Sequence, residues 1–387
     1  MTKLKSKKIF IFTTNRADYG LLKRFILLCK KSKIIKPLLI VTGSHLQKKF
    51  GYTYKEIKDD NYIKPIKVFV RINGDRPEQL ANSMANNIKA ISKIFKKRKP
   101  DLIAVLGDRI ELIPICYSAL LFNIPIIHFN GGELTEGLMD DAIRHSVTKL
   151  SHIHFVANRI YKKRLIQMGE NPKKVFNIGG TSIDNVKNTK LLNKKQLEKK
   201  LSLQFDKKIF LVTYHPVTLN KENSKKEINN LLKALSYYKN YQIIITGTNI
   251  DPNSSYIKKK IFEFCKRNTN VKYFESLGHT NYLSIMNNCD LVIGNSSSGI
   301  LEAPFLKKPV INIGNRQGGR LKSKNIISCK SSIKDIQKAF KIFESKEFKN
   351  QLKNFKIFYG NGNTSKKAVN ILEKIDLKKI LIKKFYE

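Results

Sequence analysis

A chain of 387 residues, of which 41% are hydrophobic, is long enough for two ordinary hydrophobic cores. Its five cysteines are widely spaced and form no CxxC pair, which argues against a disulfide framework or a cysteine zinc site and favours a reducing, cytoplasmic location. The formal net charge is +44, but the lysines occur along the whole chain and not in one stripe, so we expect attraction of small anionic substrates and no nucleic-acid partner.

Short apolar runs alternate with longer amphipathic segments through the first half of the chain. The first run, at 8–14, is too short to span a membrane and is followed by no cleavage site, so we expect neither a membrane segment nor a signal peptide. Further strands are expected at 35–44, 66–72, 101–108, 124–132, 152–158 and 174–180, and helices at 17–31, at 77–97, up to about 122 and near 138–150. Near-continuous apolar strands separated by helices predict a parallel sheet covered on both faces.

This pattern breaks between 181 and about 208 into a polar, lysine-rich stretch with one short predicted helix at 192–201. A second alternating series follows, with strands expected at 207–216, 241–249, 271–276, 290–299 and 308–314, and helices near 224–239, 254–267, 282–289 and 300–306. We therefore predict the α/β class, with two Rossmann-like parallel-sheet domains, 1–180 and 181–364, facing a cleft. The last segment, about 365–387, has a helical period and is expected to pack on the N-terminal domain.

Polar residues follow several of the apolar runs directly, and ligands of open parallel sheets bind beyond the carboxyl ends of the strands. Any one such residue is more often a helix cap or a turn residue, but several in series indicate a ligand site. In chain order these residues are Arg16, Asp18, Asp108, Arg109, Glu133, Asp140, Asp141 and His215.

The segment GNSSSGILEAP, 294–304, indicates a phosphate site. Its small residues allow backbone N–H groups to approach an anion, and the N-terminus of the following helix adds a positive dipole. Glu302, one turn into that helix, is placed to accept hydrogen bonds from ribose hydroxyls. The residues expected to bind a nucleotide here are Ser296, Ser297, Ser298, Gly299 and Glu302.

Six motifs together resemble the UDP-N-acetylglucosamine 2-epimerases, and more closely their hydrolysing branch, which makes N-acetylmannosamine or a related sugar for nonulosonates. The motifs are TTNRADYGLL at 13–22, LGDRIE at 106–111, HFNGGELTEG at 128–137, DDAIRH at 140–145, YHP at 214–216 and NSSSGILEAP at 295–304. The resemblance implies a GT-B type, glycosyltransferase-like fold, a UDP-sugar substrate in the interdomain cleft, no cofactor and a homodimer. A GT-B glycosyltransferase, the rival class, would not require the motifs of the first domain.

The family reaction is an anti elimination of UDP to a glycal, followed by hydration with inversion at C2. The resemblance implies that Asp108, Glu133 and Asp141 are the acid/base groups, and their individual roles stay open. Arg16 and His215 are expected to stabilise the leaving diphosphate together with the serine run. Asp18, Arg109, Asp140, Arg144 and His145 are secondary candidates. Asn130 stands where non-hydrolysing relatives have a carboxylate, which supports the hydrolysing branch and leaves the role of Glu133 less certain.

The substrate expected from the resemblance is UDP-N-acetylglucosamine, which gives N-acetylmannosamine and UDP. The alternative is a UDP- or GDP-linked 2,4-diacetamido-2,4,6-trideoxyhexose, as in legionaminic acid type pathways. The histidines of the HIH segment, 152–154, alternate along a predicted strand with no third ligand nearby in the sequence, so we expect them to be structural and expect no metal.

Overall fold

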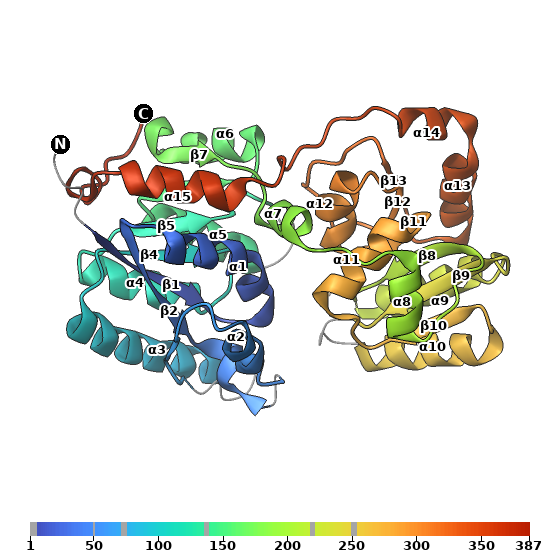
Figure 1. Ribbon diagram of the computed structural model, residues 1–387, viewed down its shortest axis with the longest axis horizontal. Coiled ribbons are helices and arrows are strands. Elements are labelled where there is room, and N and C mark those ends of the chain that lie inside the picture. Colours follow the sequence, from blue (N-terminus) through green and yellow to red (C-terminus); the bar gives the residue numbers. More distant parts are fainter. Residues whose placement is uncertain (1–5, 49–50, 71–75, 135–138, 217–220, 249–253) are drawn as a thin grey trace. The chain divides into compact units, whose positions relative to one another are not determined.

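The computed structural model describes the chain apart from residues 1–5, 49–50, 71–75, 135–138, 217–220 and 249–253 (Figure 1). The contacts between residues divide the chain into two compact units. Unit 1 consists of Met1–Leu134, Leu138–Lys187 and Tyr359–Glu387, and unit 2 consists mainly of Asn188–Phe358.

In the described part of unit 1, seven strands form one parallel sheet in the order β3-β2-β1-β4-β5-β6-β7. The strands are β1 (Lys7–Thr13), β2 (Ile35–Val41), β3 (Ile66–Lys67), β4 (Leu102–Leu106), β5 (Ile126–Phe129), β6 (Ile153–Val156) and β7 (Val175–Asn177). Strand β3 is shorter than the predicted strand at 66–72. Val68 and Val70 remain buried while Phe69 is exposed, so the apolar run continues to pack beyond the paired residues.

The helices that the structure describes in unit 1 cover both faces of this sheet. They are α1 (Arg16–Lys31), α2 (Tyr54–Asp60), α3 (Pro77–Arg98), α4 (Leu112–Leu121), α5 (Met139–Leu150), α6 (Arg159–Gln167), α7 (Thr181–Asn188) and α15 (Thr364–Lys374), with 3₁₀ turns at Gly43–Leu46, Pro172–Lys174 and Leu377–Lys379. Helix α7 falls in the stretch that the sequence analysis assigned to a polar linker. It is short and amphipathic, and its apolar residues Ile183 and Val186 are buried.

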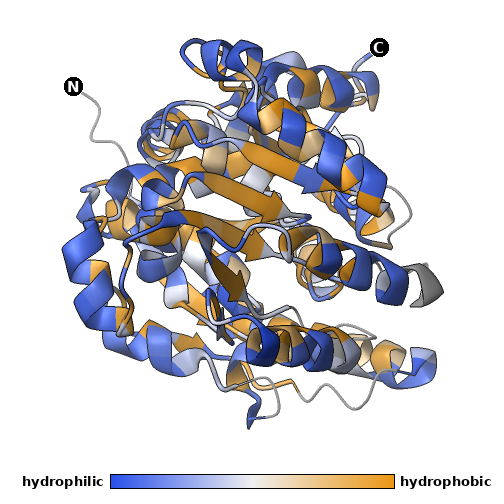
Figure 2. Ribbon diagram, turned by 90° about the vertical axis from the view of Figure 1, so that its right-hand side faces the viewer, coloured by the Kyte–Doolittle hydropathy of each residue, from blue (hydrophilic) through white to orange (hydrophobic). Residues whose placement is uncertain are grey.

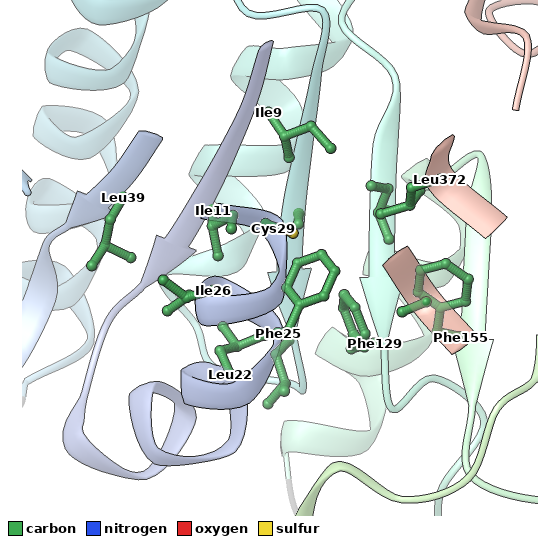
Figure 3. Packing of buried hydrophobic residues seen from close by; sticks show 14 of the residues in the cluster. Ile9, Ile11, Leu22, Phe25, Ile26, Cys29, Leu39, Phe129, Phe155 and Leu372 are labelled. Carbon is green, nitrogen blue, oxygen red and sulfur yellow. The ribbon is translucent and has the colours of Figure 1, made fainter. Parts of the chain in front are cut away.

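Alternate residues of β1 point to opposite faces of the sheet, as the period of a strand requires. Ile9 and Ile11 pack with residues of α1 and α15, and Figure 3 shows this layer around Phe25 of α1 and Phe129 of β5. On the other face, Phe10 and Phe12 pack with residues of α3 and α4. Burial on both faces explains why the strands read as continuous apolar runs.

In the described part of unit 2, six strands form a second parallel sheet in the order β10-β9-β8-β11-β12-β13. The strands are β8 (Lys208–Thr213), β9 (Tyr241–Thr246), β10 (Val271–Phe274), β11 (Leu291–Gly294), β12 (Val310–Ile313) and β13 (Ile326–Cys329). The helices are α8 (Lys194–Leu201), α9 (Lys221–Leu235), α10 (Ser254–Arg267), α11 (Gly278–Asn288), α12 (Ser297–Phe305), α13 (Ile333–Glu344) and α14 (Lys346–Gln351).

Two hydrophobic clusters cover the two faces of this second sheet. One cluster joins Phe210 and Val212 of β8 to α9, α10 and α13, and the other joins Ile209 and Leu211 to α8, α11 and α12. In Figure 2 the strands are mostly hydrophobic, while the helices show hydrophilic outer faces. This pattern is what a buried parallel sheet with amphipathic covering helices requires.

The C-terminal segment differs from the predicted helix over about 365–387. Helix α15 ends at Lys374, and beyond the 3₁₀ turn the last residues have no regular secondary structure. Among the helices that the structure describes, no helix combines the length and the apolar composition that a membrane span needs.

Candidate functional site

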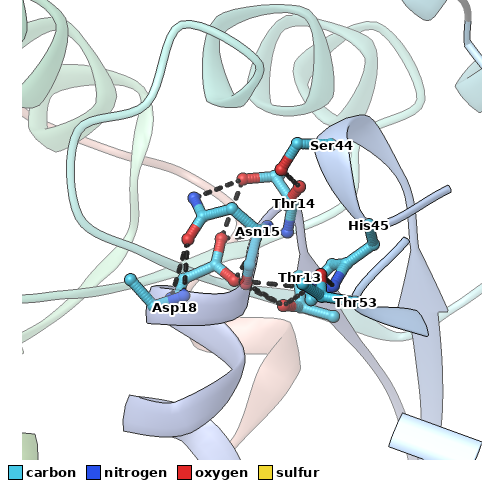
Figure 4. Close-up of polar contacts among 8 residues, drawn as sticks. Thr13, Thr14, Asn15, Asp18, Ser44, His45 and Thr53 are labelled. Carbon is cyan, nitrogen blue, oxygen red and sulfur yellow. Dashed lines mark hydrogen bonds and ion pairs between the residues drawn. The ribbon is translucent and has the colours of Figure 1, made fainter. Parts of the chain in front are cut away.

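The turn between β1 and α1 is closed by Asp18 in the first turn of the helix (Figure 4). The Asn15 side chain accepts hydrogen bonds from the backbone of Ala17 and Asp18, and Asp18 accepts one from the Asn15 nitrogen at 3.2 Å. Asp18 also accepts from the backbone and hydroxyl of Thr14 at 2.9 and 2.8 Å. Burial raises the pKa of Asp18, and these hydrogen bonds oppose the shift. Asp18, a secondary candidate from the sequence, therefore holds this turn in shape.

Arg16 is the first residue of α1, and its side chain is exposed beside this turn. An exposed guanidinium at a helix N-terminus is suited to bind phosphate oxygens. A residue that the sequence analysis missed lies beneath the turn: the buried ring of His45 approaches the Thr13 hydroxyl at 2.9 Å. Burial lowers the pKa of His45 to about 4, so its imidazole is neutral at pH 7 and supports the turn as a hydrogen-bonding group.

Arg144 of α5 brings the acid/base candidates of unit 1 together. Its guanidinium is almost fully buried, and Nη1 donates to Asp141 Oδ1 and to the backbone oxygen of Glu133, each at 2.8 Å. Nη2 forms an ion pair with Asp108, directly after β4. Asp108 and Asp141 therefore lie beside one another on a single buried cation, whose one positive charge is shared between the two carboxylates. The sequence analysis ranked Arg144 only as a secondary candidate.

Asp140 adds a third carboxyl group to this cluster. Burial raises the pKa of Asp140, and the negative charge of Asp108 raises it further, while Arg109 and Arg144 oppose the shift. Asp140 therefore favours its protonated form more than an isolated aspartate does. The exposed Arg109, next to Asp108 in the chain, acts on this carboxyl group through its charge.

His145 follows Arg144 on α5 and lies at the edge of the cluster. Its Nε2 is 3.9 Å from Asp141 Oδ2. Burial lowers the pKa of His145, and the charge of Asp141 opposes this shift, so the imidazole is neutral at pH 7.

Glu133 is buried in the turn that follows β5. The turn contains Asn130 at a φ of 62° and Gly132 at a φ of 79°, both in the left-handed region. Asparagine tolerates that region better than most residues, which explains the residue type found at position 130. The last residues of the HFNGGELTEG motif, 135–137, lie outside the described residues.

His215 follows β8 in unit 2 and is fixed by the buried Asn295, which follows β11. The His215 nitrogen donates to Asn295 Oδ1 at 2.7 Å, and Asn295 Nδ2 donates to the His215 oxygen at 2.8 Å. Burial lowers the pKa of His215 to about 4, and the nearby charge of Arg316 lowers it further. The imidazole is therefore neutral at pH 7 and suited to hydrogen bonding.

The serine run forms the start of α12. Ser296 is the N-cap, and its hydroxyl accepts from the nitrogen and the hydroxyl of Ser298 at 3.4 and 3.0 Å. Ser298 itself is buried, with its hydroxyl 2.6 Å from the hydroxyl of Tyr282, while Ser297 is partly exposed. Ser296 and Ser297 thus remain available to a ligand, whereas Ser298 and the unpredicted Tyr282 shape the turn.

Two glycines allow this turn to form. A Cβ at Gly294, whose φ is 130°, would overlap the backbone oxygen of Thr213 on the neighbouring strand. A Cβ at Gly299 would come within 3.1 Å of a Val310 methyl group, because α12 packs closely on β12. Gly299 thus lets the helix approach the sheet.

Glu302 is partly buried on α12, one turn beyond the serine run. Burial raises the pKa of Glu302 to about 7. A desolvated carboxylate of this kind binds hydroxyl donors strongly, and a ribose diol offers two.

Arg316 and Gln317 follow β12 and complete this end of the second sheet. Arg316 Nη1 and Gln317 Nε2 donate to the backbone oxygen of Asn295 at 3.2 and 2.9 Å. The sequence analysis missed both, although they stand just after an apolar run, the position that it used to select Arg16 and Asp108.

The HIH histidines make structural contacts. His154 Nε2 lies 2.9 Å from Glu170 Oε2, and His152 Nδ1 accepts from the Ile126 nitrogen at 3.2 Å. Within the described parts of the chain, no group of three or more His, Cys, Asp or Glu side chains forms a metal site.

Comparisons of the sequence with known proteins show which family the chain belongs to. A family profile described as UDP-N-acetylglucosamine 2-epimerase matches residues 28–373. The GDP/UDP-N,N'-diacetylbacillosamine 2-epimerase (hydrolyzing) of Campylobacter jejuni is 45% identical, over 89% of this chain and 90% of that protein. The polysialic acid biosynthesis protein P7 of Escherichia coli is 35% identical, over 95% of this chain and 94% of that protein.

The fold is also found among solved structures. The crystal structure of the Neisseria meningitidis UDP-GlcNAc 2-epimerase bound to UDP-GlcNAc has a TM-score of 0.81, at 22% identity, and the match covers 95% of this chain and all of that chain. The predicted α/β class with two parallel-sheet units and the predicted enzyme family are confirmed. The chain belongs to the UDP-N-acetylglucosamine 2-epimerase family.

Proposed function

We propose that the chain is a hydrolysing nucleotide-sugar 2-epimerase that acts on a UDP- or GDP-linked 2,4-diacetamido-2,4,6-trideoxyhexose. The 45% identity to a hydrolysing N,N'-diacetylbacillosamine 2-epimerase supports this substrate class. The observation that supports the chemistry best is the buried Arg144, which holds the carboxylates of Asp108 and Asp141 side by side.

The first step is the loss of the nucleotide. Asp108 or Asp141 removes the C2 proton, the C1–O bond breaks with its electrons going to the diphosphate, and a C1=C2 glycal forms. A carboxylate positioned for such a transfer contributes on the order of 10²- to 10⁴-fold to the rate. Arg144 orients both carboxylates through its buried guanidinium.

The second step is the addition of water. The hydroxyl group adds to C1, and C2 receives a proton on the face opposite to the one that lost it, which inverts C2 and gives the free sugar. Asp140 is suited to donate this proton, because burial and neighbouring charge raise the pKa of its carboxyl group. Glu133 remains an acid/base candidate beside this cluster.

Arg16 and the groups of unit 2 bind the nucleotide in this proposal. Arg16 and the backbone at the start of α12 bind the diphosphate, with Ser296 and Ser297 supplying hydroxyl groups. His215 donates a hydrogen bond to the leaving group, and Glu302 accepts the ribose hydroxyls.

UDP-N-acetylglucosamine is the second candidate substrate. The 35% identity to a polysialic acid biosynthesis protein favours it, because polysialic acid synthesis requires an N-acetylmannosamine unit. The reaction steps and the residue roles are the same for both substrates.

A panel in deuterated water tests the reaction and decides the substrate. The purified protein is incubated with UDP-N-acetylglucosamine and with UDP- and GDP-N,N'-diacetylbacillosamine, and nucleotide release and C2 deuteration are followed by NMR. We expect fastest release from a diacetamido sugar, with deuterium at C2 of the product. Nucleotide release without C2 deuteration would contradict the elimination, and no release from any substrate would contradict the proposed function.

Helix α4 supports a homodimer. Tyr117, Leu120, Leu121 and Phe122 are 45%, 46%, 58% and 39% exposed, and the sequence contains no Lys, Arg, Asp or Glu between Glu111 and Glu133. Two copies of a chain with a net charge of +44 repel each other least where they meet through a segment without lysine. We propose that α4 packs on α4 of a second copy across a two-fold axis, and that the dimer is cytoplasmic, where nucleotide sugars are available.

A further inference from the structure

The C-terminal tail, Leu381–Glu387, packs on unit 1 next to the C-terminal end of α5 and beyond α6, near the C-terminus marked in Figure 1. The Tyr386 nitrogen donates to the Gly169 oxygen at 2.9 Å, and the Phe385 ring lies so close to Gly169 that a Cβ there would overlap it. Lys149 Nζ is 5.1 Å from the centre of the same ring. These contacts fix a segment that has no secondary structure of its own.

Lys383 of this tail binds the C-terminal end of α5. Its Nζ donates to the backbone oxygens of Thr148, Lys149 and Ser151 at 3.2, 2.7 and 2.6 Å. Thr148 and Lys149 belong to the last turn of α5 and Ser151 follows it, and a cation at this end interacts favourably with the helix dipole. The Thr148 oxygen also accepts from the Ser151 nitrogen at 3.1 Å. One ammonium group from the tail therefore binds three backbone oxygens at the C-terminal end of α5.

The same ammonium group is held by a buried carboxylate. Lys383 Nζ lies 2.7 Å from Glu170 Oε2, and Glu170 also pairs with Lys149 and His154, each at 2.9 Å. Burial alone would raise the pKa of Glu170, but its three partners hold the pKa at about 2. Lys383 is thus fixed in place by a carboxylate that stays ionised throughout the physiological pH range.

Helix α5 is connected to Asp108 at two points. At its N-terminal half, Arg144 pairs directly with Asp108. At its C-terminal half, Thr148 Oγ1 is 3.3 Å from Nδ1 of the buried His128, whose Nε2 donates to the Gly107 oxygen at 2.8 Å. Burial lowers the pKa of His128 to about 3, so the ring is neutral and serves as a donor at Nε2 and an acceptor at Nδ1.

We propose that Lys383 is a positioning residue for the carboxylate cluster: by binding the end of α5 it sets the place of Arg144 and, through Thr148 and His128, the place of Asp108. Lys383 contacts no reacting group itself. A shift of about 1 Å in catalytic geometry costs up to about 10²-fold in rate, so loss of this contact should act on turnover. This role of Lys383 rests on the proposed function, and turnover in the epimerase reaction is one of the two measurements that test it.

The test compares Lys383→Met with Lys384→Met in the full-length protein. Methionine keeps most of the aliphatic chain and removes the ammonium group, and Lys384 is an exposed neighbour in the same tail. We expect Lys383→Met to lower kcat about tenfold with KM within twofold of wild type, because the nucleotide-binding residues of unit 2 are untouched. Lys384→Met should match wild type, and Lys383→Arg, which keeps the charge, should regain part of kcat.

Hydrogen exchange without substrate provides the second readout and does not depend on the reaction. Amides of Met139–Leu150 should exchange faster in Lys383→Met than in Lys384→Met at the same temperature.

If Lys383→Met is too unstable to purify, Phe385→Ala takes its place. This variant weakens the packing of the tail and keeps the ion pair, so it should show both the lower kcat and the faster exchange, each to a smaller degree. Faster exchange with unchanged kcat would overturn the proposal, as would unchanged exchange. If the wild-type protein shows no turnover, the proposed function is overturned, and the hydrogen-exchange result alone tests whether Lys383 stabilises α5.

Discussion

Arg144 contacts both Asp108 and Asp141 with a guanidinium that is 2% exposed. Arg109 is the neighbour of Asp108 in the chain. In the structure Arg109 points to solvent, and Arg144 arrives from a helix 36 residues later. The pairing of Arg144 with Asp108 therefore depends on where α5 packs in the folded chain, which the motifs do not encode.

Asp108→Asn should nearly abolish turnover. The amide keeps the size of the side chain but removes the negative charge and the basic oxygen, so kcat should fall by about 10²- to 10⁴-fold. Binding of UDP, measured by calorimetry, should stay within about threefold of wild type. Wild-type turnover in this variant would show that Asp108 is not an acid/base group.

Glu302→Gln should act on nucleotide binding. A hydrogen bond to a charged group contributes about 1.5–3 kcal/mol, so the Kd for UDP should rise about tenfold or more, while kcat changes little. Glu347→Gln, an exposed acid on α14, is the matched control and should bind UDP as wild type does.

The affinity of the wild type for UDP should also depend on pH near neutrality. Burial raises the pKa of Glu302 to about 7, and the ionised carboxylate accepts hydroxyl hydrogen bonds more strongly than the protonated acid does. Affinity should therefore rise as pH increases from 6 to 8 and then level off. Calorimetry across this range checks the slope, and a slope that persists unchanged in Glu302→Gln would assign the titration to another group.

At the scale of elements, a strand, a turn of small residues and a helix were predicted for the segment from β11 to α12, but α12 begins at Ser297, inside the range 290–299 that was assigned to the strand. The Ser296 cap starts the helix earlier than the apolar pattern indicates. The close approach of Gly294 to Thr213 was not predictable, because it depends on the neighbour of β11 being β8, 78 or more residues earlier in the chain.

Gly294→Ala should destabilise the protein by about 2–4 kcal/mol, since a Cβ would overlap the Thr213 oxygen and φ is 130°. Urea-induced unfolding followed by circular dichroism measures this change. Gly20→Ala, in α1 with no atom within 4 Å of the added Cβ, is the control and should be neutral or stabilising by about 0.5–1 kcal/mol. Equal stability of the two variants would refute the steric argument.

Helix α15 shows why a helical period overestimates a helix. The predicted segment ran to the last residue, but α15 ends at Lys374. Lys7 of β1 donates from Nζ to the oxygens of Leu372, Glu373 and Ile375 at 2.7, 2.9 and 2.6 Å. A partner more than 360 residues away in sequence thus satisfies the carbonyl groups at the helix end, and local sequence contains no sign of it.

At the scale of the whole molecule, Leu121→Glu should convert the proposed dimer to a monomer. The new carboxylate would be buried without a partner in an apolar contact, which costs several kcal/mol. Light scattering after size exclusion should change from twice the chain mass to 44.6 kDa. Ile342→Glu, at an exposed apolar position on α13 of unit 2, should leave the mass unchanged. A wild-type protein that is already monomeric would contradict the dimer.

The sequence alone determined the class of fold and the family, because apolar periodicity and short motifs are local properties of the chain. The domain boundaries at 180 and 364 stay predictions, as do the roles of the site residues. Only the tertiary structure decided that Arg144 joins Asp108 to Asp141, that Asp18 and Ser298 support turns, and that Lys383 caps α5. The first and the last of these are contacts between segments far apart in the sequence. The contacts of Asp18 and Ser298 are choices among several possible hydrogen-bond partners. Both kinds of contact are fixed by packing and desolvation in the folded chain, which local patterns do not encode.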